Sequence, residues 1–250
     1  MAASGACRHA LLLAGDVASP PRDKHNRITA PIFGDGGSAT LVSYAPGSAP
    51  LTFSLHTDGR GYSHIISPAG GARLPFVHTE KENSPLLEDI IDSNGNPWRL
   101  NGIFMDGKAI FDFTMHVVPD HITKFLSKCA LSPEKLDYVF LHQANKQIVN
   151  VIAEKIHIPA EKAPFGTFSR YGNLSSASIP AALCDQFGAA GDTGSKAMLL
   201  CGFGVGLSWG SCLWLPQQCR CSDVITVPSK PVSRESKIQF WRHHLSGGKN

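Results

Sequence analysis

Two stretches decide the fold: Val139-Phe140-Leu141-His142-Gln143-Ala144-Asn145 and Arg170-Tyr171-Gly172-Asn173-Leu174-Ser175-Ser176-Ala177-Ser178-Ile179-Pro180. The first has the pattern of a buried strand that carries His142 at its C-terminal end. The second places Asn173 in a glycine turn directly before a helix start. Because ligands of open α/β sheets bind where strands end and helices begin, we expect these two side chains to meet in one site.

Outside these stretches, apolar runs alternate with helical patterns, which predicts an α/β fold with a largely buried sheet. The run at residues 10–16 has the pattern of a strand that is buried on both faces. Pro119 interrupts the helical spacing of residues 107–129, so we expect a break near Val118 and a second helix from there. The other predicted strands are residues 37–44, 51–56, 137–141, 197–202 and 207–215, and the other predicted helices are residues 143–157 and 178–187.

The order strand, F-G-x-G turn, strand occurs twice along the chain. The turns are Phe33-Gly34-Asp35-Gly36 and Phe203-Gly204-Val205-Gly206, and an apolar run precedes each. This echo suggests two related halves. If each copy closes a similar unit, the first unit would begin well before Met1, so we expect the first half to be incomplete.

Composition and charge exclude several classes of function. The formal net charge of +3 comes from the segment after residue 218, so it gives no reason to expect nucleic-acid binding by the body. No apolar run approaches the ~20 residues of a transmembrane helix. The seven cysteines show no paired ligand spacing, the eleven histidines show no metal motif, and no secretory signal precedes the fold. These features favour the reducing cytoplasm and no metal.

Residues 4–216 resemble the β-ketoacyl-acyl-carrier-protein synthase III group of the thiolase fold. Five ordered motifs carry the resemblance after the opening strand. The matching segments are Ser4–Asp16, Phe33–Ala39, Met105 with Gly107 and Phe111, His142–Asn145, Gly172–Pro180 and Gly202–Trp209. The two-halved duplication of that family agrees with the internal echo.

The resemblance implies a layered αβαβα fold, thiolase-like, whose N-terminal half is incomplete and whose C-terminal half is essentially complete. Residues 1–46 would be the remnant of the N-terminal half and residues 47–100 a connection rich in strands and loops. Residues 101–216 would form the C-terminal half. Residues 217–250 lie beyond the last family strand and form a basic tail of disordered composition.

The resemblance also implies the chemistry of the site. A cysteine takes an acyl group from a thioester, a malonyl thioester loses carbon dioxide, and the resulting carbanion attacks the acyl-cysteine. His142 and Asn173 would donate hydrogen bonds to the malonyl thioester oxygen, and the N–H of Val205 would be half of an oxyanion hole. No cofactor would be bound, because the substrates are acyl thioesters of coenzyme A or phosphopantetheine. The pocket residues would be Met105, Phe203 and Gly204.

Two departures from the family pattern affect activity. The family nucleophile lies before the segment that matches Ser4–Asp16, so Cys7 does not take that role, and Cys201 has the setting of a buried, inert thiol. The family often carries arginine two residues after H-Q-A-N, on the surface that meets the acyl carrier protein. Here that position is Gln147, with Lys146 beside it. Carrier-protein docking would therefore be weak or use other charges.

Two function classes remain open. The first is an acyltransferase of the 3-oxoacyl-acyl-carrier-protein synthase III type, inactive as this isolated chain because the nucleophile is absent. The second is a non-catalytic partner subunit that binds a condensing enzyme. Either reading predicts a homodimer or a heterodimer with a synthase-fold subunit. Both also predict exposed apolar surface on the strands at 10–16 and 37–44 and on the central helices, where family elements would pack.

Overall fold

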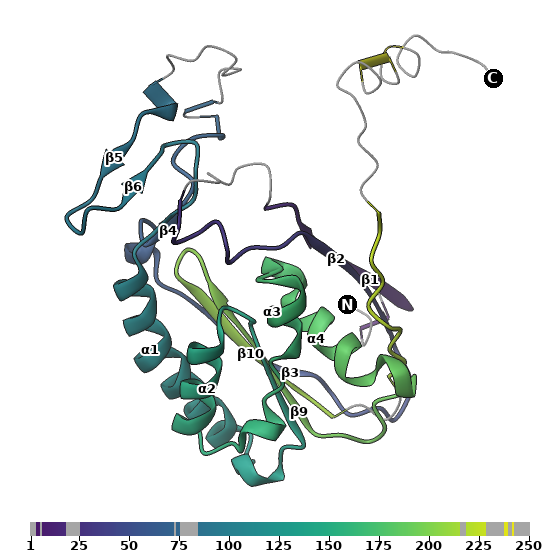
Figure 1. Ribbon diagram of the computed structural model, residues 1–250. Helices are drawn as coiled ribbons and strands as arrows, with labels where there is room; N and C mark the ends of the chain where they lie inside the picture. The colour runs from purple at the N-terminus through teal and green to yellow at the C-terminus, as the bar shows by residue number, and fades with distance from the viewer. Residues whose placement is uncertain are drawn as a thin grey trace.

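The structure is a computed structural model of the chain (Figure 1). It describes residues 4–5, 7–18, 26–72, 74–75, 85–215 and 219–228, together with Ile238, Gln239 and Arg242. Its sheets and helices form an α/β arrangement, as the alternation of patterns predicts. None of the described helices combines the length and apolar character that a membrane span needs.

A four-stranded sheet forms the centre of the body. Its strand order is β3-β10-β9-β8, with β8 and β9 parallel and the other neighbours antiparallel. The strands are β3 (Thr52–Thr57), β8 (Tyr138–Leu141), β9 (Met198–Gly204) and β10 (Ser208–Trp214). Because side chains alternate along a strand, β9 sends Leu199 and Cys201 into one core and Met198 and Leu200 into another.

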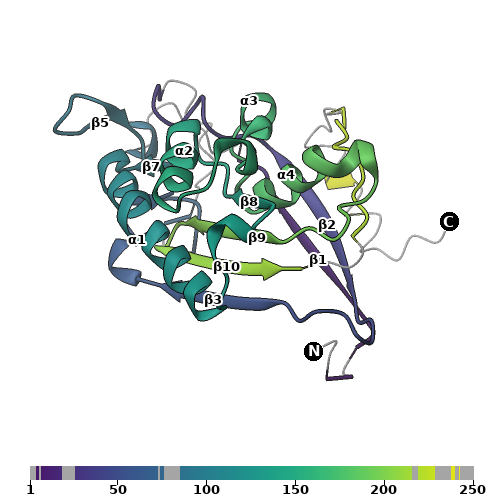
Figure 2. The ribbon, with the colours of Figure 1, turned by 90° about the horizontal axis from the view of Figure 1, so that it is seen from below.

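Helices cover both faces of this sheet (Figure 2). Helices α1 (Gly107–Lys128) and α2 (Lys146–Lys155) pack on the face that carries Leu199. Helix α4 (Ser178–Phe187) packs on the opposite face, against Met198 and Phe140. The short helix α3 (Gly166–Tyr171) leads to the turn that contains Asn173. The predicted strand at 137–141 and the predicted helix at 178–187 are confirmed within a residue.

Two helix boundaries differ from the predictions. Helix α1 runs without a break through Pro119, so the predicted second helix is wrong. Proline removes one backbone hydrogen bond, but Val118, Pro119 and Ile122 are all buried, and this packing holds the turn together. Helix α2 starts at Lys146 and not at Gln143, because Asn145 caps it: its Oδ1 accepts the N–H of Ile148 at 2.8 Å.

The connection between β3 and α1 contains only short elements in the described residues. Two small antiparallel pairs are β4 (Ile65–Ile66) with β7 (Phe104–Met105) and β5 (Ile90–Ile91) with β6 (Pro97–Trp98). The described part of the chain also contains the 3-10 turns η1 (Gly59–Gly61), η2 (Pro85–Leu87), η3 (Pro133–Lys135), η4 (Ala160–Lys162), η5 (Ser175–Ala177) and η6 (Gly188–Ala190), of which η1 and η2 lie in this connection. These short elements agree with the loop-rich composition of this region.

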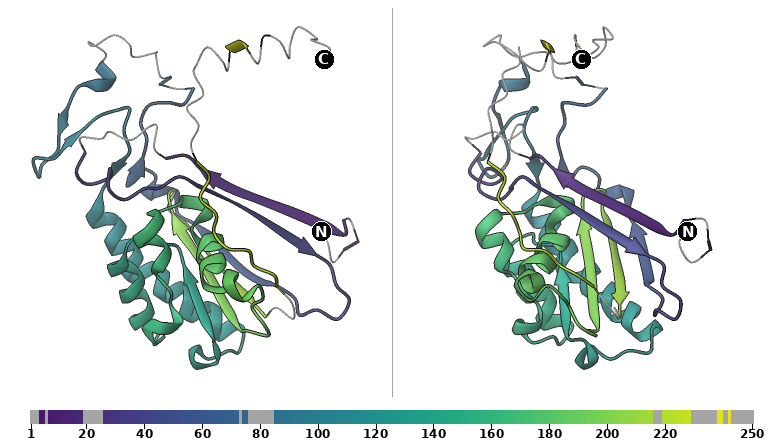
Figure 3. Two further views of the ribbon diagram at one scale, coloured as in Figure 1. Left: turned by 45° about the vertical axis from the view of Figure 1, so that its right-hand side comes forward. Right: turned by 90° about the vertical axis from the view of Figure 1, so that its right-hand side faces the viewer.

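The first half of the internal echo is a two-stranded antiparallel ribbon, β1 (His9–Asp16) with β2 (Gly36–Ser43). The second half, β9 with β10, is also antiparallel. The ribbon extends away from the four-stranded sheet (Figure 3). Leu11 is 61% exposed and Leu13 70% exposed, so the predicted burial of this strand on both faces is wrong in this chain. The predicted apolar surface on strands 10–16 and 37–44 is confirmed, with Leu41 65% exposed.

The structure describes part of the predicted tail. Arg220 forms an isolated antiparallel bridge with Asp192, and residues 224–228 are mostly exposed. Residues 217 and 218 and most residues from 229 onward lie outside the described part, and for them the predicted disorder stays a prediction.

Candidate active site

Strand β8 brings His142 to the edge of the sheet where β9 ends. The backbone N–H of His142 donates to the carbonyl oxygen of Cys201 at 2.9 Å and so continues the parallel ladder by one residue. Its ring packs edge-on against the ring of Phe203, with 5.5 Å between the centroids. The position of the imidazole is therefore determined by two neighbouring strands.

Gln143 fixes the turn that follows His142. Its side chain is fully buried, and its Nε2 donates to the carbonyl oxygens of Leu141 at 2.9 Å and Pro164 at 3.2 Å. Its Oε1 accepts the hydroxyl of Thr167 at 3.1 Å. No role for Gln143 was predicted from the sequence. A glutamine between a buried strand and a helix cap was the available signal, since a buried amide needs partners.

Asn173 is held by a segment from the first half of the chain. Its N–H donates to the carbonyl oxygen of Ile32 at 2.8 Å, and its own carbonyl accepts the N–H of Gly34 at 2.9 Å. Phe33 and Asn173 thus form an isolated parallel bridge. Residues 32–34, which include the first two residues of the F-G-D-G motif, therefore hold the asparagine turn in place. We call these three residues the brace; no pattern in the sequence indicates this role.

This close approach requires glycine at two positions. A Cβ on Gly34 would lie 1.8 Å from the carbonyl oxygen of Tyr171. Gly172 has φ +74°, and a Cβ there would lie 2.8 Å from the carbonyl oxygen of Ile32. Neither position accepts a side chain without moving the backbone that carries Asn173.

A carboxylate of the ribbon also contacts the asparagine turn. Oδ2 of Asp16 accepts the N–H of Ser176 at 3.1 Å and its hydroxyl at 2.5 Å. These two hydrogen bonds are the main reason that the pKa of Asp16 lies below its ordinary value. The end of β1 therefore supports the residues that follow Asn173.

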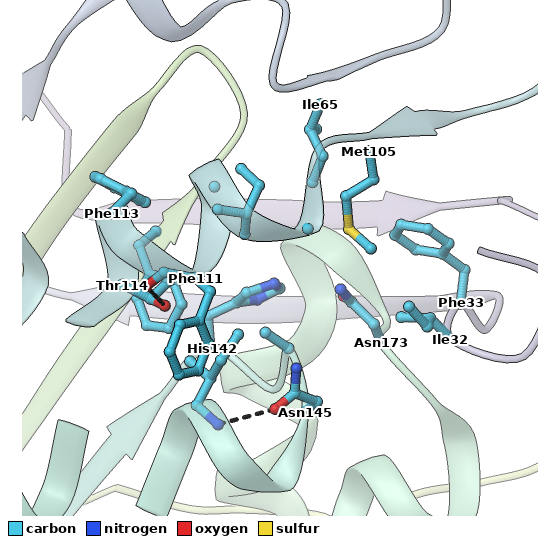
Figure 4. Close-up of a pocket in the computed structure, with 16 residues that line it drawn as sticks. Ile32, Phe33, Ile65, Met105, Phe111, Phe113, Thr114, His142, Asn145 and Asn173 are labelled. Atoms are coloured by element: carbon cyan, nitrogen blue, oxygen red, sulfur yellow. Dashed lines mark hydrogen bonds between the residues drawn. The ribbon is translucent and has the colours of Figure 1, made fainter. Parts of the chain in front are cut away.

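The side chain of Asn173 has a defined orientation. Its Oδ1 accepts the N–H of Ser175 at 2.8 Å, so its Nδ2 is the group that faces the pocket. In Figure 4 this nitrogen points toward the ring of His142. Asn173 is 8% exposed and lines the pocket. The structure thus brings the two predicted donors, His142 and Asn173, to one cavity.

The cavity has a volume of about 140 Å³ and a mainly apolar lining. Met105, Phe203 and Gly204, the three pocket residues named from the sequence, all line it. Phe33 also lines it, so both F-G-x-G motifs contribute their phenylalanine to the same cavity. The first turns of α1 contribute four more residues to the wall, Ile110, Phe111, Phe113 and Thr114.

Burial sets the protonation of the groups around the cavity. Desolvation lowers the pKa of His142 to about 4, so its imidazole is neutral at pH 7. A neutral imidazole carries one N–H and can donate one hydrogen bond. Desolvation also raises the pKa of Cys201 to about 12, and the thiol of Cys201 has no exposed surface. Cys201 is therefore an inert core residue and not a nucleophile.

The remaining candidates lie at the margin of the cavity. Val205 is 60% exposed in the loop between β9 and β10, next to Gly204. The direction of its N–H stays a prediction. Lys146 and Gln147 are exposed in the first turn of α2, beside the cavity residue Asn145. Within the described ranges, no group of three His, Cys, Asp or Glu side chains is arranged to hold a metal ion.

Comparison with known proteins agrees with this geometry. Residues 1–59 match the family described as 3-oxoacyl-[acyl-carrier-protein (ACP)] synthase III, and residues 126–215 match the description of its C-terminal part. The chain belongs to the 3-oxoacyl-acyl-carrier-protein synthase III family. The two matches contain the brace at residues 32–34 and both predicted donors, His142 and Asn173.

Similar proteins among curated sequences and solved structures are also named as β-ketoacyl- or 3-oxoacyl-acyl-carrier-protein synthases. The β-ketoacyl-acyl-carrier-protein synthase III of Streptococcus equi subsp. equi is 37% identical over 211 residues, which are 84% of this chain and 60% of that protein. The synthase III of Gloeobacter violaceus is 32% identical over 207 residues, which are 83% of this chain and 59% of that protein. The crystal structure of 3-oxoacyl-(acyl-carrier protein) synthase from Burkholderia xenovorans superposes with a TM-score of 0.76 at 30% identity, covering 89% of this chain and 60% of that one.

These neighbours support the thiolase-like α/β fold. The chain spans about 60% of the length of the curated relatives that it matches. The activity of a whole synthase III therefore comes to this chain only as a proposal.

Proposed function

We propose that this chain supplies the malonyl-thioester side of a 3-oxoacyl-acyl-carrier-protein synthase III active site. One observation carries the proposal: a neutral His142 and the Nδ2 group of Asn173 face one apolar cavity. Two neutral donors that converge in an apolar setting suit an oxygen that becomes negative during the reaction.

The proposed reaction begins with a malonyl thioester whose carbonyl oxygen accepts hydrogen bonds from both donors. The bond to the terminal carboxylate breaks, carbon dioxide leaves, and the electron pair moves into the thioester as an enolate. Because the cavity wall is mostly apolar, these hydrogen bonds to the enolate oxygen act in a low dielectric and are stronger than in water. The enolate carbon then attacks the carbonyl of an acyl-cysteine, and the cysteine thiolate leaves.

The acyl-cysteine is the part of this reaction that the described residues do not offer. Burial raises the pKa of Cys201 to about 12 and that of Cys212 to about 11, which suppresses the thiolate form. We therefore assign the acyl-cysteine to another polypeptide segment, which would pack on the apolar ribbon near Leu11, Leu13 and Leu41. The substrates would be thioesters of acyl carrier protein or coenzyme A, and the assembly a homodimer or a heterodimer with a synthase-fold subunit. The free cysteines support a cytoplasmic location.

Release of carbon dioxide from malonyl-coenzyme A tests the proposal directly, because that step needs no acyl-cysteine. The chain should release labelled carbon dioxide, and Asn173→Ala and His142→Ala should each lower the rate by roughly 10²-fold. His116→Ala on α1 and Asn150→Ala on α2 are matched controls. They make the same two substitutions at exposed positions that do not line the cavity. Equal rates in all four variants would exclude the proposed roles of His142 and Asn173.

Two further measurements separate the two function classes. Intact mass after incubation with acetyl-coenzyme A should show no hydroxylamine-labile acyl adduct; a stoichiometric adduct would show that this chain carries its own nucleophile. The non-catalytic alternative is motivated by the exposed ribbon and the absence of an activated thiol in the described part of the chain. It predicts stable binding to a synthase subunit without any release of carbon dioxide.

A further inference from the structure

Three of the seven cysteines meet at the C-terminal end of helix α4, far from the cavity. Cys184 lies on α4, and Cys219 and Cys221 lie in the segment that follows β10. We call these three residues the thiol cluster. The segment reaches this place through backbone bonds: the N–H of Thr193 donates to the carbonyl of Cys219 at 3.0 Å, and the N–H of Cys221 donates to the carbonyl of Gly191 at 3.3 Å.

The segment is closely packed against the end of α4. A Cβ on Gly188 would lie 2.5 Å from Oδ1 of Asp223 and 2.8 Å from the carbonyl oxygen of Ser222. Cys221 packs against the apolar core that contains Phe187 and Phe140. Cys184 and Gly188 lie inside the segment that matches the C-terminal part of the synthase III family, whereas Cys219 and Cys221 lie beyond its last matched residue, 215. The thiol cluster therefore joins the family part of the chain to the segment that follows it.

The thiols of the cluster are mutual neighbours. The Cys219 thiol hydrogen-bonds the Cys221 thiol, and the Cys184 thiol hydrogen-bonds the backbone and side chain of Ser222, the residue after Cys221. Burial, and then the closeness of the other two thiols, raises the pKa of Cys221 to about 12. The pKa of Cys184 and that of Cys219 are also raised, first of all by burial.

We propose that Cys184 and Cys221 form a reversible disulfide that fastens residues 219–223 to helix α4. The co-reactant is a low-molecular-weight disulfide such as oxidised glutathione. One protein thiol loses its proton and attacks the small disulfide, which releases one glutathione thiolate and leaves a mixed disulfide. The second protein thiolate attacks the protein sulfur of that bond and releases the second glutathione. Two protein thiols are thus oxidised and one glutathione disulfide is reduced.

Cys184 with Cys221 is the favoured pair for two reasons. The Cys184 thiol contacts Ser222, the residue next to Cys221, and residues 222 and 223 pack directly on Gly188 at the end of the same helix, so Cys184 and Cys221 lie in one neighbourhood. A bond between Cys219 and Cys221 would close a very small ring, and strained disulfides of this kind are easily reduced. Two molecules of reduced glutathione reopen the bond by the reverse exchange, which restores both protein thiols and gives one glutathione disulfide. Because a raised thiol pKa slows the first attack, the bond should form faster at pH 9 than at pH 7.

The test treats the full chain with oxidised glutathione under native conditions, blocks the remaining thiols, and maps the cross-linked peptides by mass spectrometry. We expect a Cys184–Cys221 peptide, higher protection of the segment from proteolysis, and a higher melting temperature than in the reduced chain. Cys184→Ser and Cys221→Ser should each abolish these changes. Cys219→Ser and the distant Cys129→Ser should retain the cross-link.

Three results would overturn the proposal. They are a Cys219–Cys221 cross-link in place of the expected one, mixed glutathione adducts alone, and a cross-link that leaves proteolysis unchanged. The same oxidation in concentrated urea separates native proximity from intrinsic reactivity. There the native pair should lose its preference, and an unchanged preference in urea would also contradict the inference.

Discussion

Replacing His142 by glutamine tests the electrostatics of the site through the pH dependence of stability. The imidazole of His142 is desolvated, and this burial lowers its pKa from 6.5 to about 4. In the unfolded chain the same imidazole is solvated and titrates near its ordinary pKa of ~6.5. The folded state therefore binds fewer protons than the unfolded state between these two pH values, and the substitution removes this difference.

The sign and size of the effect follow from this linkage. As the pH falls below 6.5, protonation of the unfolded state pulls the wild-type chain toward unfolding. Each pKa unit is worth about 1.4 kcal/mol, so a shift from 6.5 to about 4 corresponds to roughly 3 kcal/mol. The loss should be absent above pH 7, develop between pH 6.5 and pH 4, and level off below pH 4.

Urea unfolding followed by tryptophan fluorescence gives the free energy of unfolding at each pH. The difference between the wild-type chain and His142→Gln should change by roughly 3 kcal/mol across this window, whereas His116→Gln at an exposed position of α1 should follow the wild type. An NMR titration of the His142 imidazole checks the pKa independently. Parallel pH curves, or a measured pKa near 6.5, would refute the assignment of His142 as a buried neutral donor.

Three other substitutions test the support of the site and the exposed ribbon. By urea unfolding, Gly34→Ala should cost about 3 kcal/mol or more, while Gly37→Ala, whose nearest neighbour atom is 3.9 Å away, should stay within about 0.5 kcal/mol; similar losses in both would contradict the brace. Asp16→Asn should cost roughly 1 kcal/mol at pH 7. Because the folded pKa of Asp16 is lowered, the difference in the free energy of unfolding between the wild type and Asp16→Asn should vanish as the pH falls through that pKa. A difference that stays constant down to pH 2 would show that the charged carboxylate does not stabilise the turn. Leu13→Lys should change stability by less than about 0.5 kcal/mol but reduce binding of an apolar dye, whereas Leu199→Ala should cost about 2–5 kcal/mol; unchanged dye binding would show that the ribbon surface is covered.

Local patterns in the sequence were sufficient to bring together the two residues that we propose as donors, His142 and Asn173. The strand at 138–141 and the turn at Gly172 both have short-range signals, namely an apolar run and a glycine before a helix start. The general rule for strand ends predicts that His142 and Asn173 share one site, and both residues line the same cavity. The family motifs added the identity of the pocket residues, and Met105 and Phe203 line the cavity.

Other features depend on contacts between distant segments and have no local signal. Pro119 stays inside α1 because its neighbours are buried against the sheet, which outweighs the local cost of proline. An apolar run such as residues 10–16 does not specify which segment packs on it, so the run alone cannot show whether the strand is buried. The bonds between Asp16 and Ser176 join residues 160 positions apart, so no pattern within a short window could show them.

The two proposed donors, His142 and Asn173, are held in position by different parts of the chain. His142 is fixed by its bond to Cys201 and its contact with Phe203, both within the C-terminal half. Asn173 is fixed by backbone bonds to residues 32 and 34 of the first half. A change in the first half should therefore displace the amide donor and leave the imidazole in place. The asparagine turn, to which we assign a role in decarboxylation, is thus physically joined to the ribbon on which we expect the acyl-cysteine segment to pack, so assembly of the two sides of the site can be coupled through residues 32–34.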